Sequence, residues 1–194
     1  MNVDEFWALV ERSATAGPSR DAREDFLTRR LTRAPRAELL DWVQRLAATR
    51  EPANTYRLWR AAEIIMYGWC STDSFHYFQM WLVGLGRAAY DAAIADPDSL
   101  AGVPAVQRLA DLAWDDWEDA DFPEWETLEY VAVDIGEDRE DVADDVRTVL
   151  EEERGVRVRF DPSPDDLEWR DLEIADLAGR YPRLWALFGA GWRG

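Results

Sequence analysis

The chain has 194 residues, 47% of them hydrophobic, and its 40 acidic and 22 basic side chains give a formal net charge of -18. This length and apolar content suffice for one core, whereas one cysteine and one histidine exclude an internal disulfide framework and a four-ligand zinc site. No apolar run approaches the roughly 18 residues of a membrane helix, and the acidic start differs from a signal peptide, so we expect a soluble cytoplasmic protein.

Apolar residues recur at helical spacing along most of the chain, which predicts an all-α fold built from many helices. Glycines at 84 and 86 interrupt one helical pattern, so we expect a kink or close backbone packing there. In chain order, helices are expected at about 3–14, in a segment ending near Ala34-Pro35, at 35–48, at 55–67, from Ser71 or Thr72 onward, at 88–94, from 104 to 117, at 124–135 and at 138–153.

The one pattern typical of a β-strand lies at residues 156–160, where apolar and basic side chains alternate. No second strand is visible to pair with it, so the fold has at most one short β element. Short helical pieces rich in tryptophan and leucine follow. The sequence therefore predicts a helical domain at 1–153 and a C-terminal helical appendage at 154–194, packed on the same core.

Nearly all of the excess charge lies in residues 111–153, which hold 19 acidic and 2 basic side chains. A field of this sign repels nucleic-acid phosphates, so no nucleic acid is expected as a ligand, and it attracts basic proteins, polyamines or divalent cations. Two interpretations stay open: an acidic face that only keeps the protein in solution, or a surface for a dedicated partner.

Tryptophan is the second unusual component, with 11 copies in the chain. In the acidic segment, Trp114, Trp117, Phe122 and Trp125 alternate with carboxylates, a mixture that could bind a basic, partly apolar peptide through cation-π contacts. The competing interpretation is that these rings only cover the edge of the core.

No complete catalytic or cofactor motif occurs in the sequence, so neither a cofactor nor a metal is expected. A phosphate-binding loop and an EF-hand loop are absent, and Cys70 and His76 lie too far apart on one helical segment to form a catalytic pair. Asp73 and Asp98 remain candidates for acid and base, although helix capping and turn formation explain both residues as well. The other candidates for this site are His76 or Arg87 as electrostatic partner, Ser71 and Asp96 in the turns, and Trp59 and Trp81 as walls.

Phe6-Trp7, the block from Gly68 to Tyr90 with Cys70-Ser71-Thr72-Asp73-Ser74-Phe75, and the stretch from Asp96 to Ala101 form a distinctive set. Through this set, residues 1–135 resemble an uncharacterised family of bacterial proteins with an N-terminal Phe-Trp and a central Cys-Ser-Asp-Asp-x-Phe motif. Thr72 replaces the first aspartate of that motif, so this chain keeps one of the two carboxylates. The resemblance implies a mainly helical domain and no established activity.

The leading hypothesis is a non-enzymatic protein that binds a basic protein or peptide through residues 111–153, as a regulatory, antitoxin-like or immunity-like partner would. The alternative is a hydrolase or small-ligand site where the turns at 68–73 and 96–99 meet. A third hypothesis is a structural subunit that buries its tryptophans in a homodimer.

Overall fold

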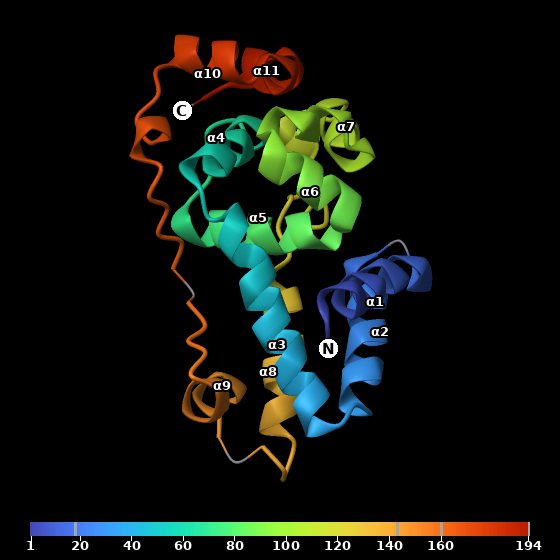
Figure 1. The fold of residues 1–194 in the computed structure, drawn as a ribbon. Coiled ribbons are helices and arrows are strands. Elements are labelled where there is room, and N and C mark those ends of the chain that lie inside the picture. The colour runs from blue at the N-terminus through green and yellow to red at the C-terminus, as the bar shows by residue number, and fades with distance from the viewer. Residues whose placement is uncertain (18, 143, 160, 194) are drawn as a thin grey trace.

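A computed structural model describes residues 1–17, 19–142, 144–159 and 161–193. Figure 1 shows an all-α fold, as predicted, and no strand occurs among the described residues. The helices are α1 (Val3–Ala16), α2 (Arg20–Thr32), α3 (Arg36–Arg50), α4 (Tyr56–Ile65), α5 (Thr72–Gly84), α6 (Arg87–Ala95), α7 (Pro104–Ala110), α8 (Glu126–Glu137), α9 (Val146–Arg154), α10 (Ile174–Arg180) and α11 (Pro182–Phe188). Short 3-10 helices are η1 (Glu51–Ala53), η2 (Pro97–Gly102), η3 (Trp114–Asp116), η4 (Leu167–Trp169) and η5 (Gly189–Gly191).

Helix α5 is the centre of the fold, because side chains on nearly all of its faces are buried. A helix that is apolar all round must be enclosed by other elements, and α5 contacts α1, α3, α4, α6 and α8. The Ser71 hydroxyl caps its N-terminus by accepting from the backbone N–H of Ser74 at 3.1 Å. Its C-terminus lies at the expected break, where Gly86 has a φ of 93° and α6 begins one residue later.

The prediction of a helix over 104–117 is wrong at its C-terminal end, since α7 ends at Ala110. The apolar spacing that suggested a longer helix comes from Trp114 and Trp117, which pack into the core from the 3-10 turn η3 and the residue after it. The expected helix over 138–153 begins only at Val146, where the Asp145 side chain caps α9. Closely spaced carboxylates between 137 and 145 repel one another in a helix, which accounts for its late start.

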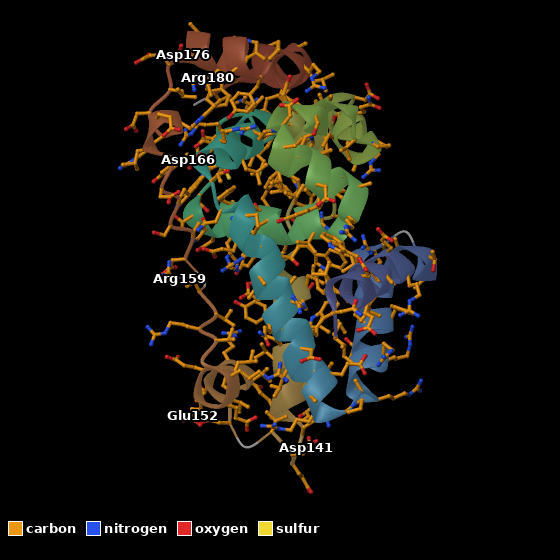
Figure 2. All side chains as sticks on the ribbon, viewed as in Figure 1. Asp141, Glu152, Arg159, Asp166, Asp176 and Arg180 are labelled. Carbon is orange, nitrogen blue, oxygen red and sulfur yellow. The ribbon has the colours of Figure 1, made fainter. Side chains whose placement is uncertain are left out.

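Residues 156–159 and 161–166, here called the strap, run without helix or strand between α9 and η4 along one side of the helices (Figure 1). No strand forms at 156–159, and residue 160 lies outside the described part of the chain. In place of a second strand, side chains from elsewhere in the fold form hydrogen bonds with the strap. The Oδ1 atom of Asn54, the residue after η1, accepts from Ser163 N at 3.2 Å. Figure 2 labels Arg159 and Asp166 on this segment, and the Asp166 carboxylate accepts from the first two N–H groups of α4.

Toward the C-terminus, α11 packs against α4 and η2, and α10 packs against α11. Leu177, Tyr181, Leu184 and Phe188 from these helices are buried in the same core as α1 and α3. The division of the chain between 153 and 154 stays a prediction. No helix in the described ranges combines the length and the apolar character needed to cross a membrane.

Candidate functional site

Most carboxylates of residues 111–153, here called the acidic segment, lie on the surface. In the part between α7 and α8, residues 111–125, here called the acidic loop, Asp115, Asp116, Glu118 and Asp119 are exposed. Ion pairs with arginines of the described chain involve Asp141, Glu151 and Glu153 from the acidic segment, and none of the four loop residues. These four carboxylates therefore carry negative charge that no ion pair with an arginine of the described chain neutralises.

Aromatic rings anchor the acidic loop to the core. Trp114 and Trp117 lie 4.8 Å apart, centroid to centroid, and the Tyr67 ring meets Trp114 edge-on at 5.5 Å. Tyr67 also contacts Phe188 of α11 at 5.5 Å, and its φ of 54° is rare for a residue with an aromatic side chain. Trp117 is 9% exposed, so this ring is turned inward while the neighbouring carboxylates point outward.

A groove of about 780 Å³ opens beside this loop, between the start of α2, the end of α5 and α7. Trp81, Leu109 and Trp125 provide its apolar lining, and Asp21, Asp119 and Asp121 provide carboxylates. We call this cavity the acidic groove. It joins two of the tryptophans singled out from the sequence, Trp81 and Trp125, although at 9% and 3% exposure their rings offer little surface to a peptide.

Three arginines also line the groove: the exposed Arg108 of α7, and Arg20 and Arg23, which are used by the fold. Arg20 donates to the carbonyl oxygen of Ala120 at 3.0 Å and to that of Phe122, which fixes the course of the loop. Arg23 lies over the Trp125 ring at 4.4 Å and donates to the Gly84 carbonyl oxygen at 2.8 Å, and burial lowers its pKa to about 10. A Cβ at Gly84 would lie 2.5 Å from the Trp125 ring, so the expected close packing at this glycine is confirmed.

The candidate acid and base, Asp73 and Asp98, lie in different parts of the fold and each has a structural role. Asp73 is exposed in the first turn of α5. Asp98 is 3% exposed and caps α11, because its carboxylate accepts from Leu184 N at 2.8 Å, from Arg183 N at 3.1 Å and from Arg183 Nε at 2.9 Å. Asp96 accepts from Asp98 N at 3.2 Å. Neither Asp73 nor Asp98 lines any of the five principal cavities in the described part of the protein.

The remaining candidates of the mid-chain turns are dispersed. Arg87, on α6, is exposed and pairs with Asp4 at 2.7 Å. The Trp59 ring stacks on Phe75 at 4.6 Å, and its indole N–H donates to the Cys70 carbonyl oxygen at 3.1 Å. Burial raises the pKa of the Cys70 thiol far above its ordinary value, which leaves little thiolate for nucleophilic chemistry.

His76 lies in a buried ionic cluster with Arg50 of α3 and Glu129 of α8. Sequence reasoning singled out His76 and missed its two charged partners. Periodicity was the available signal: Arg50 continues the buried stripe of Leu39, Val43 and Leu46, and Glu129 stands one position from Leu128 on the apolar face of α8. Within the described chain, no three histidine, cysteine or carboxylate side chains gather as a metal site would require.

The chain belongs to the DUF4240 family, described as a protein of unknown function, whose family model matches residues 1–138. The resemblance to an uncharacterised family is thereby confirmed. No curated protein and no solved structure matches the chain significantly. The acidic groove and the Arg50–His76–Glu129 cluster lie within the matched range, whereas the strap and the C-terminal helices lie beyond it.

Proposed function

We propose that the protein is a non-enzymatic binding partner that recognises a basic segment of another protein through the acidic loop and the acidic groove. One observation carries this proposal: four carboxylates of the acidic loop are exposed and form no ion pair with an arginine of the described chain. Aromatic rings and Arg20 already hold the loop that carries them in place. A site ordered before binding loses less conformational entropy when the partner arrives. Regulatory and immunity-type proteins act by such binding.

The chemistry of the groove fits a lysine or arginine side chain. Such side chains lay an aliphatic stem along apolar surface and keep their charged end near water. The half-buried Leu85 and Ala105 offer apolar surface, and Asp21 and Asp119 line the same groove and would meet the charged end. The wider negative field of residues 111–153 would raise the association rate of a basic partner, an effect that salt screens beyond about 8 Å at physiological ionic strength.

A hydrolase or small-ligand site at the turns 68–73 and 96–99 was the alternative hypothesis. No specific observation favours it, because Asp98 is engaged by Arg183 and Leu184 while Asp73 faces solvent. The homodimer hypothesis stays a prediction as well.

Two variants with the same change in net charge test the proposal. The loop variant replaces Asp115, Asp116, Asp119 and Asp121 with asparagine, and the control variant neutralises Asp134, Glu137, Asp138 and Glu140 at the end of α8 and just after it. All four control residues are exposed. The binding of a labelled arginine-rich peptide is measured by fluorescence anisotropy at about 0.15 M salt.

We expect the loop variant to bind the peptide about tenfold more weakly, since tenfold corresponds to about 1.4 kcal/mol spread over four partly screened charges. The control variant should bind within about twofold of the unchanged protein, because none of its four residues lines the groove. Equal weakening in both variants would mean that only net charge matters, and no weakening in either would mean that the loop does not bind. Both results contradict the proposal.

A further inference from the structure

Three ionisable side chains lie buried together where α3, α5 and α8 meet. Arg50 is 5% exposed, and His76 and Glu129 are each 6% exposed. Burying charged groups is costly unless they are paired and hydrogen-bonded. The arrangement of hydrogen bonds in this cluster therefore decides which charge states the fold tolerates.

The geometry fixes one tautomer of His76. Arg50 Nη1 lies 2.5 Å from His76 Nδ1, and a guanidinium can only donate, so Nδ1 must be the accepting nitrogen. The proton of the neutral ring then sits on Nε2, which donates to Glu129 Oε2. In this state, Glu129 compensates the charge of Arg50, and the neutral imidazole lies between the two groups.

The same guanidinium holds the strap. Arg50 Nη2 donates to the backbone carbonyl oxygen of Arg159, the strap residue labelled in Figure 2. Val158 lines a small cavity together with Arg50 and Glu129, so the strap covers the cluster directly. One side chain thus joins the only histidine of the protein to a segment that lies outside the DUF4240 match.

We propose that His76 is a proton-operated latch: when it gains a second proton, Arg50 withdraws and residues 156–159 of the strap come away from α3 and α8. A second proton can bind only at Nδ1, and it removes the lone pair that accepts from Arg50. Two cationic groups would then face each other at the 2.5 Å that now separates their nitrogens. Arg50 must move, and its bond to the Arg159 carbonyl oxygen moves with it.

Charged and titratable groups from four elements face the cluster. Glu129 of α8 can retain the protonated imidazole as an ion pair, so the cluster has a second stable pairing. From α9, Arg147 lines the same cavity and adds positive charge. From η1, Glu51 lies close enough to act on the charge of Arg50, and it offers that side chain a carboxylate nearer to the surface. From α5, Tyr77 meets the imidazole ring edge-on at 5.4 Å.

Because the chain has a single histidine, its titration can be followed directly in the full-length protein. The Hε1 signal of His76 is recorded by NMR while the pH is lowered from about 7.5 to about 5.5, so that the uptake of a second proton is observed directly. Hydrogen exchange of the strap is measured over the same range, corrected for the intrinsic effect of pH. We expect the strap to exchange at least about tenfold faster once His76 is protonated, while α1 keeps its protection, as local opening predicts.

The variant His76→Gln separates the latch from other effects of acid. Its amide can accept from Arg50 and donate to Glu129 but does not titrate in this range, so its strap should stay protected at both ends of the range. Equal acceleration in this variant would overturn the proposal, as would a wild-type strap that stays protected while His76 titrates. Simultaneous loss of protection in α1 and the strap would also overturn it, since that result is global unfolding. If the variant does not fold, the wild-type data still test the latch, because the strap must open at the same pH at which the His76 signal shifts. Opening at another pH, or without any shift of that signal, would overturn the proposal.

Discussion

Replacing Glu129 with glutamine is expected to lower the free energy of unfolding by about 3–5 kcal/mol, the range measured when one partner is removed from a buried ionic pair. Glu129 is the carboxylate that compensates Arg50 inside the α3–α5–α8 junction, where both side chains are buried. Glutamine has nearly the same shape, so the loss would come from charge and hydrogen bonding rather than from a cavity. Urea unfolding followed by circular dichroism measures the change.

Glu137→Gln is the matched control for this substitution. Glu137 is exposed at the end of the same helix, and the change of residue is identical. Surface substitutions of this kind leave stability almost unchanged. If both variants lost the same stability, or if neither lost any, the buried cluster would not contribute to the fold as described.

The second large effect is expected for Asp98→Ala, which should lower the free energy of unfolding by about 2–3 kcal/mol. The substitution leaves the buried N–H of Leu184 without its acceptor at the start of α11 and removes the partner of Arg183 Nε. Because α11 buries Leu184 and Phe188 against the core, we also expect faster cleavage of the C-terminal helices in limited proteolysis.

Asp73→Ala is the control here, because Asp73 is exposed and its contribution is limited to the first turn of α5. Its loss of stability should be clearly smaller, and its proteolysis pattern should be unchanged. Similar effects in the two variants would mean that Asp98 does not hold α11.

Helical periodicity was sufficient to predict the fold class and most of the first seven helices, because their apolar stripes face one common core. It failed at Trp117, where an aromatic side chain at helical spacing is buried from a turn instead. It also failed at 138–145, where the carboxylates oppose a helix that the flanking valines would allow. The sequence pattern at 156–160 is typical of a strand, but an isolated segment has no second strand to pair with, and no strand forms at 156–159.

Only part of the candidate site could be predicted from the sequence, because the rest depends on contacts between distant parts of the chain. Charge segregation was visible in the sequence, whereas which carboxylates are paired depends on arginines far away in the chain, such as Arg36 with Glu153. The burial of Trp117 and Trp125 likewise depends on Tyr67, Arg23 and Gly84, three residues from other helices and turns. Arg50 and Glu129 followed apolar stripes, but a stripe does not reveal that two charged members will meet at one histidine.

The most direct test of the binding account is a hydrogen-exchange footprint of the full-length protein with the arginine-rich peptide bound. The account predicts slower exchange in the acidic loop, above all at 118–125, and at the start of α2, the two segments that carry the carboxylates of the groove. Protection confined to α9 or to the C-terminal helices, or binding without any protection of the loop, would contradict it.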